Sequence, residues 1–345
     1  MFSPLEILNL YYSDGRSTGN KDNWLWQRMN KLLSWENMLE RGYQTDLCPL
    51  LYYIIEKTDV IEKYSKTNPT NAINPTNAIN ILKQHYYASL ARNMILLNEL
   101  NHVVKELNNQ GIQAVVLKGA HLAEHVYPDI ACRPMGDLDI LIEDEEKERC
   151  YSILQNMGYK KFREDPRQLI LHQSFYKKPF GIFVKIELHH ALAKDVFMVD
   201  FDLDEVYSKG RISTEYYLLY LSWHMVHHGV ARLLWLCDFV EVLKQNIDTV
   251  RWNIALEKGS LFKVYKHFLF SRELVNSILF PVTCYNNGRL GSFSDYFSKN
   301  LFLKIQRKIL RYQYPKELRH LLSTYLMQQV DIIKFIPRYV RYRFF

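Results

Sequence analysis

The organisation of this chain is clearest in one stretch, Arg133-Pro134-Met135-Gly136-Asp137-Leu138-Asp139-Ile140-Leu141-Ile142. A loop signal containing proline and glycine runs directly into an apolar segment, which predicts a strand beginning near Asp137. Because side chains alternate along a strand, Asp137 and Asp139 project to one side, about 7 Å apart, while Leu138 and Ile140 project to the other. A strand with two acids on one face and apolar residues on the other is therefore the leading functional candidate.

The residues before this stretch predict a strand, a glycine turn and a short helix. The run Ala114-Val115-Val116-Leu117 is followed at once by Lys118 and Gly119, and the helix after them ends near Tyr127. A glycine at a helix N-terminus allows a phosphate to approach backbone amides, and Lys118 adds a positive charge. Lys118 and Gly119 are therefore candidate phosphate-binding residues, and the alternative is a tight turn with a surface lysine.

A third acid lies farther along the chain. Residues 174–178 and 182–189 flank Pro179-Phe180-Gly181, which predicts a hairpin. Glu187 falls on the polar face of the second strand, opposite the apolar side chains of Ile182, Val184, Ile186 and Leu188. If this strand neighbours the one containing Asp137 and Asp139, three carboxylates converge into an all-oxygen site suited to Mg²⁺. Such a site fits phosphoryl or nucleotidyl transfer with two metal ions about 3.5–4 Å apart.

These motifs resemble the uncharacterised bacterial nucleotidyltransferase family of the DNA polymerase beta-like superfamily. The resemblance rests on Leu117-Lys118-Gly119, Tyr127, residues 133–142 and Val184-Lys185-Ile186-Glu187-Leu188-His189. It implies an α+β fold, with a nucleotidyltransferase core built on a small mixed sheet, and two Mg²⁺ ions held by Asp137, Asp139 and Glu187. It also implies an NTP substrate that transfers a nucleoside monophosphate to a hydroxyl acceptor.

Two features qualify the expected nucleotide site. The wider superfamily usually has Gly-Ser or Gly-Gly nearer the acid pair, whereas here Ala120 follows Gly119 and sixteen residues separate Ala120 from Asp137. Arg133, four residues before Asp137, has two interpretations: its planar guanidinium could hold the triphosphate, or it could pair with Asp137. We expect Lys118, Gly119 and Arg133 to contact the triphosphate.

The hydrophobic pattern divides the chain into three regions. We expect a helical region over 1–110, the nucleotidyltransferase core over 111–200, and a second helical region over 201–345. Apolar residues recur every three or four positions between Tyr86 and Leu107, which predicts a helix. The tandem duplication within residues 68–79 predicts a surface loop because it is polar and interrupted by proline.

The composition excludes several classes of protein. Of the 345 residues, 48% are apolar and 23% are charged, which rules out disordered, collagenous and integral-membrane chains. The N-terminus lacks the pattern of a secretory signal, so we expect a cytoplasmic protein without a transmembrane segment. The five cysteines form no C-x-x-C pair, and we expect reduced, mostly buried thiols.

The positive charge is concentrated at the C-terminus. The net charge of the chain is +7, whereas residues 301–345 alone contain ten basic and two acidic side chains. Cations alternate with aromatic residues over 334–345, so this tail could make weak contact with an anionic membrane surface or an RNA backbone. The alternative is that it docks on its own domain with its basic groups in water.

Other residue patterns leave further hypotheses open. His224 and His228 have a spacing that can hold zinc, but there is no H-E-x-x-H motif, which favours packing over a metal-dependent phosphohydrolase. The repeat Asp200-Phe201-Asp202-Leu203-Asp204 lacks a flanking strand and a glycine turn, so we give it no role. A nucleotide-binding or partner-binding module without turnover is the main alternative to an enzyme. The acceptor remains open among sugars, small metabolites, protein side chains and RNA ends.

Overall fold

The computed structural model describes residues 4–12, 35, 45–59, 76–162, 172–192, 212–228, 232–246, 250–261 and 264–278. The acidic repeat at 200–204 and the basic tail at 334–345 lie outside the described residues, as does the first copy of the tandem duplication.

The centre of the fold is a mixed five-stranded sheet with the order β1-β2-β5-β4-β3. Strands β2 and β5 are parallel, and the other neighbouring pairs are antiparallel. The expected strands and hairpin are confirmed, and the fold is a mixed α+β fold with a small sheet. The strands are β1 (Val115–Leu117), β2 (Leu138–Leu141), β3 (Lys160–Lys161), β4 (His172–Lys177) and β5 (Val184–His189).

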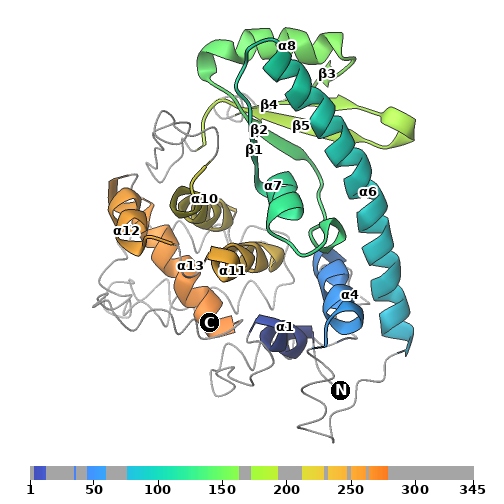
Figure 1. Ribbon diagram of the computed structural model, residues 1–345, viewed down its shortest axis with the longest axis vertical. Coiled ribbons are helices and arrows are strands. Elements are labelled where there is room, and N and C mark those ends of the chain that lie inside the picture. Colours follow the sequence, from blue (N-terminus) through green and yellow to red (C-terminus); the bar gives the residue numbers. More distant parts are fainter. Residues whose placement is uncertain are drawn as a thin grey trace, which may run out of the picture.

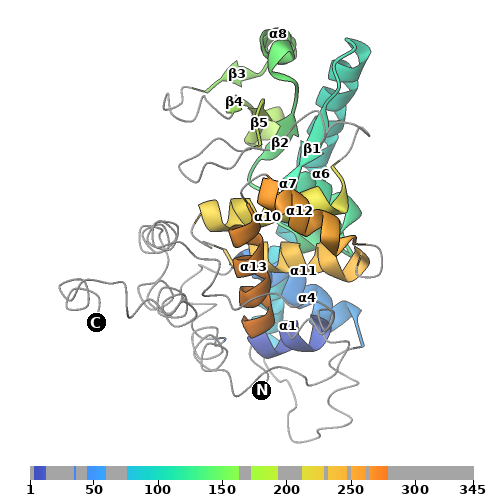
Figure 2. The same ribbon diagram turned by 90° about the vertical axis from the view of Figure 1, so that its left-hand side faces the viewer.

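Helices come before, between and after the strands along the chain. Figure 1 shows the long helix α6 running beside the sheet and continuing past it toward α4, and Figure 2 shows the later helices grouped below the sheet. The α-helices are α1 (Pro4–Tyr12), α4 (Cys48–Lys57), α6 (Thr76–Asn109), α7 (Lys118–His125), α8 (Lys147–Asn156), α10 (Thr214–His227), α11 (Leu234–Asn246), α12 (Trp252–Leu261) and α13 (Tyr265–Ile278). Short 3-10 turns are η1 (Thr45–Leu47), η2 (Ile130–Cys132), η3 (Asp144–Glu146) and η4 (Pro179–Gly181).

The alternation of side chains along the strands divides the apolar residues between two clusters. On one face of the sheet, Ile140 and Ile186 pack with Leu100 and Val103 of α6 and with Leu154 of α8. On the other face, Val115 and Leu117 of β1 and Leu141 of β2 join a second cluster that includes residues of α1, α4, α10, α11 and α13. Burial of apolar surface on both faces fixes the sheet between α6 and the C-terminal helices.

Helix α6 begins within the second copy of the tandem duplication. Thr76–Ile79 were expected in a surface loop, but they form the first turn of α6, and Ala78 is buried. Pro75 stands directly before this helix in the sequence, and a proline at or just before the start of a helix does not interrupt its hydrogen bonds. The polar repeat is therefore compatible with a helix start, and the loop expectation is wrong for these residues.

Two further expectations concern membranes and thiols. Within the described residues, no helix is both long enough and apolar enough to cross a bilayer. Cys48, Cys132, Cys150 and Cys237 are buried thiols outside any disulfide, as expected, and Cys284 lies outside the described residues.

Candidate functional site

The strand register brings the three predicted acids, Asp137, Asp139 and Glu187, to one face of the sheet, where they form a carboxylate row. In the parallel pair of β2 and β5, Asp139 lies directly beside Glu187. Asp137 precedes Asp139 by two residues and therefore lies on the same face. Leu117 of β1 pairs with Asp139 from the other side, so the next residue, Lys118, enters the site at this row. Residues from three distant parts of the sequence thus meet where β1, β2 and β5 run side by side.

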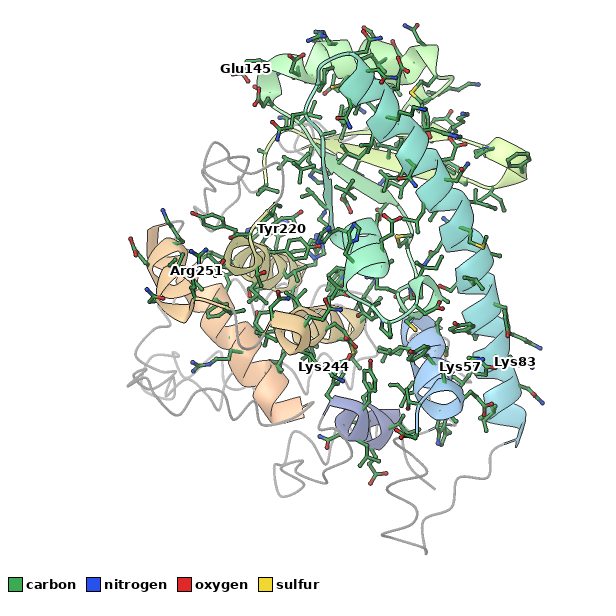
Figure 3. The ribbon with its side chains drawn as sticks, viewed as in Figure 1. Lys57, Lys83, Glu145, Tyr220, Lys244 and Arg251 are labelled. Atoms are coloured by element: carbon green, nitrogen blue, oxygen red, sulfur yellow. The ribbon has the colours of Figure 1, made fainter. Side chains whose placement is uncertain are left out.

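Lys118 makes a direct ion pair with the central acid. Its Nζ donates a hydrogen bond to Oδ1 of Asp139 at 2.9 Å and lies 5.9 Å from the centre of the Tyr220 ring. Tyr220 belongs to α10 and is labelled in Figure 3. Burial lowers the pKa of Lys118, but Asp139, Tyr220 and Glu187 together outweigh burial, so the net pKa is above its usual value. The backbone of Lys118 has φ of +43°, a strained conformation for a residue with a side chain. The surrounding structure therefore holds this lysine in place as a fixed positive charge.

Glu187 is surrounded by basic side chains. Its Oε1 accepts a hydrogen bond from Nζ of Lys185 at 2.5 Å, and its Oε2 lies 3.6 Å from Nε2 of His189 and 3.8 Å from Nε2 of His172. Burial raises the pKa of Glu187, but the nearby His189 and the charge of Lys118 oppose burial and bring the pKa well below its usual value. Glu187 is therefore ionised across the neutral pH range.

The other two acids differ in their protonation. Burial raises the pKa of Asp139, but Lys118 and His189, whose Nε2 lies 2.7 Å from Oδ1 of Asp139, lower it below the usual value. For Asp137, burial together with the charges of Asp139 and Glu187 outweighs the attraction of Lys118 and Lys185 and raises its pKa to about 6. Two permanently ionised acids therefore raise the energy of charging the third.

This donor set fits a divalent cation. Three carboxylates on one face supply the hard oxygen ligands that Mg²⁺ prefers. The repulsion that raises the pKa of Asp137 is relieved when a cation lies among the carboxylates. Asp137, Asp139 and Glu187 are therefore the candidate Mg²⁺ ligands, although they are not the three described residues whose ligand atoms all lie within 4.8 Å of one another.

Arg133 lies in a different environment from the one expected. Its guanidinium is buried and binds Asp238 of α11 through two hydrogen bonds, from Nε at 3.1 Å and from Nη2 at 2.8 Å. Tyr127 donates a further hydrogen bond to Asp238 at 2.8 Å. These hydrogen bonds pair Arg133 with Asp238 and not with Asp137, so the geometry gives Arg133 a structural contact with the C-terminal helices.

Gly119 is required by this arrangement of Arg133. A Cβ placed on Gly119 would lie 2.8 Å from Nη1 of Arg133 and 3.3 Å from Cγ of Met135. Both distances are shorter than ordinary van der Waals contact, so a side chain at this position would displace its neighbours. The glycine after Lys118 therefore allows the loop containing Arg133 to pack against the start of α7.

Helix α6 holds the same loop from the other side. Arg92 donates hydrogen bonds to the carbonyl oxygens of Met135 at 3.1 Å and Gly136 at 3.3 Å, and Asn93 donates to that of Arg133 at 2.9 Å. These contacts end at the residue directly before Asp137. Arg92 and Asn93 were not predicted from the sequence, because their partners are backbone atoms about 40 positions away.

The histidines also divide into two groups. His224 and His228 pack against the Trp235 ring, with ring centroids 4.9 and 5.5 Å away, and burial lowers the pKa of His224. In the part of the chain that the structure describes, the group of three side chains arranged to hold a metal ion lies elsewhere, at His172, Glu187 and His189. His189 was visible in the sequence on the polar face of its strand, whereas His172 gave no signal before the strand register was known.

A mixed sheet with acids on adjacent parallel strands and a lysine-glycine turn after its edge strand is consistent with a nucleotidyltransferase-like core. Residues 32–280, about 72% of the chain, match the family described as uncharacterised nucleotidyltransferase, and the chain belongs to that family. Comparisons with curated proteins and with solved structures found no match. The family supports a transferase of nucleotidyl groups as the general type of reaction.

Proposed function

We propose that this protein transfers a nucleoside monophosphate from an NTP to a hydroxyl acceptor, with Mg²⁺ as cofactor and pyrophosphate as the leaving group. The observation that carries the proposal is the parallel register of Asp139 and Glu187, with Asp137 on the same face and Lys118 beside them. Metal-bound carboxylates next to a fixed positive charge suit a reaction at a triphosphate.

In this proposal, the acceptor oxygen bonds to the α-phosphorus, and the bond from that phosphorus to the bridging oxygen of pyrophosphate breaks. Mg²⁺ held by Asp137, Asp139 and Glu187 would supply neutralisation of charge on the phosphate oxygens. Glu187, kept ionised by its neighbours, favours loss of the acceptor's hydroxyl proton to solvent. Lys118 supplies positive charge for the phosphates, and the Gly119 amide at the start of α7 is a donor for a phosphate oxygen.

Arg133 is not part of this mechanism. Its two hydrogen bonds to Asp238 occupy the planar edge that a triphosphate would need. Arg133 acts instead by holding the loop before Asp137 against the C-terminal helices.

The experiment is a calorimetric titration of ATP, GTP, CTP and UTP with Mg²⁺ into the wild type and an Asp139→Asn variant. We expect binding of a preferred nucleotide by the wild type and its loss in the variant, because removing a metal carboxylate costs several kcal/mol. Asp144→Asn is the matched control, since Asp144 is an exposed acid in η3, outside the carboxylate row.

Release of pyrophosphate across a panel of hydroxyl acceptors then tests turnover. Transfer that survives in Asp139→Asn would contradict the assignment of the metal ligands. Nucleotide binding without pyrophosphate release over a broad panel would favour a binding module in place of an enzyme.

A further inference from the structure

Three side chains of the β4–β5 hairpin form a compact group of metal-binding atoms. One ligand atom from each of His172, Glu187 and His189 lies within 4.8 Å of the other two. Within the described residues, this is the one group of three histidine, cysteine or acidic side chains with that arrangement. Two of its members, the histidines, take no part in the proposed transfer reaction.

The hairpin register explains why these atoms converge. His172 and His189 are direct partners across β4 and β5, and their ring centroids are 4.9 Å apart. Glu187 precedes His189 by two residues, so its carboxylate projects from the same face of β5. All three residues lie on two strands joined by continuous pairing over six positions, from His172 with His189 to Lys177 with Val184. A rigid scaffold therefore holds the ligand atoms together.

The chemistry of this group differs from that of the carboxylate row. Two imidazole nitrogens and one carboxylate oxygen form the ligand set of many zinc sites, whereas Mg²⁺ prefers oxygen ligands and retains its waters. Three protein ligands also leave a coordination position open, which is typical of catalytic and not of structural zinc sites. From this juxtaposition we infer that His172, Glu187 and His189 bind a Zn²⁺ ion.

The neighbouring groups bear on this inference in two ways. Nε2 of His189 lies 2.7 Å from Asp139, so the alternative is that His189 only orients that carboxylate by a hydrogen bond. Glu187 belongs to both the hairpin group and the carboxylate row, which means that bound Zn²⁺ would lie next to the proposed Mg²⁺ site. The inference goes beyond the proposed function, because Zn²⁺ binding by the hairpin requires neither a nucleotide nor an acceptor.

The test is equilibrium dialysis of the full chain with Zn²⁺ in the presence of excess Mg²⁺, without nucleotide. We expect the wild type to bind a Zn²⁺ ion that Mg²⁺ does not displace, and His172→Asn to weaken that binding by at least about 10- to 100-fold, the loss seen for residues that only support a ligand. His190→Ala is the matched control: His190 follows His189 in the sequence, but its Nδ1 lies 3.3 Å from Asp144 and it is not in the ligand group. We expect His190→Ala to bind Zn²⁺ like the wild type.

A second measurement on the wild type does not depend on any variant being folded. Co²⁺ substitutes for Zn²⁺ and absorbs visible light with a spectrum that reports nitrogen and oxygen ligands, whereas thiolate ligands add strong near-ultraviolet bands. Burial raises the pKa of the Cys48 and Cys150 thiols to about 12, which disfavours their competing for the ion. We expect the wild type to give a low-coordinate Co²⁺ spectrum without thiolate bands.

The inference is overturned if Zn²⁺ binding is equal in the wild type and folded His172→Asn, or if the Co²⁺ spectrum is that of a hexa-aquo or thiolate-bound ion. The outcome is separate from that of the proposed function. Zn²⁺ binding without any binding of NTP and Mg²⁺ would support the hairpin site and contradict the transferase proposal. Binding of NTP and Mg²⁺ without Zn²⁺ binding would contradict the hairpin site and support the transferase proposal.

Discussion

The ion pair between Arg133 and Asp238 leads to a sharp prediction about stability. Asp238 has 1% of its surface exposed and Arg133 has 8%, so both charges are almost completely removed from water. Two hydrogen bonds join them, and Tyr127 donates a third to the same carboxylate. Removing one partner of such a pair leaves an uncompensated buried charge and costs about 3–5 kcal/mol. This is a large part of a typical stability of about 5–15 kcal/mol.

We therefore expect Asp238→Asn and Arg133→Met each to lower the free energy of unfolding by about 3–5 kcal/mol, measured by urea denaturation. The double variant Arg133→Met with Asp238→Leu should recover most of this loss, because no charge is then left unpaired. The control is Glu146→Gln, which removes the partner of Arg149 in an exposed ion pair and should cost less than about 1 kcal/mol.

Two results would refute this reasoning. One is a loss of less than about 1 kcal/mol in Asp238→Asn, which would mean that the pair is not held in a dry interior. The other is an Arg133→Met variant with wild-type stability and no nucleotide binding, which would return Arg133 to the role of a triphosphate ligand.

Three further predictions follow from the packing and charge of the site's surroundings. Gly119→Ala should destabilise the protein by about 1–3 kcal/mol in thermal unfolding, because the added Cβ would meet Arg133. Gly136→Ala is the control and should have little effect, since nothing lies within 4 Å of its added Cβ. Equal effects of the two substitutions would contradict this prediction. Burial raises the pKa of Glu241 from 4.5 to about 7, so its contribution to stability is present below pH 4.5 and is lost as the pH rises through 7. Between pH 4.5 and pH 8, the free energy of unfolding should therefore fall by about 3 kcal/mol more in the wild type than in Glu241→Gln. Equal pH dependence in the two proteins would contradict the raised pKa of Glu241. Arg92→Ala should lower transfer or nucleotide binding more than about tenfold with folding retained, because Arg92 holds the backbone directly before Asp137; wild-type activity would contradict that positioning role.

The sheet and its acids were predictable because their signals are local. Alternation in residues 137–142 and 182–189 predicts two strands, each with one polar face, and the structure has β2 and β5 there. The start of α6 was predicted less well, since the polar duplication favours a loop until a buried Ala78 shows that the helix packs there. Sequence-local patterns therefore predict which face of an element is polar better than where the element begins.

The amino-acid sequence alone placed Asp137, Asp139 and Glu187 on polar strand faces and Lys118 with Gly119 at a turn, because a strand's period of two acts over neighbouring residues. It did not decide which strands are neighbours, and only the parallel pairing of β2 and β5 puts Asp139 beside Glu187. Likewise, the local sequence left Arg133 with either a triphosphate or Asp137 as its partner, and its pairing with Asp238 depends on a contact between residues 105 positions apart. The pairing of His172 with His189 has the same origin. Long-range pairing is set by burial of the shared core, so the tertiary structure decided which charges are neutralised and which side chains can bind a ligand together.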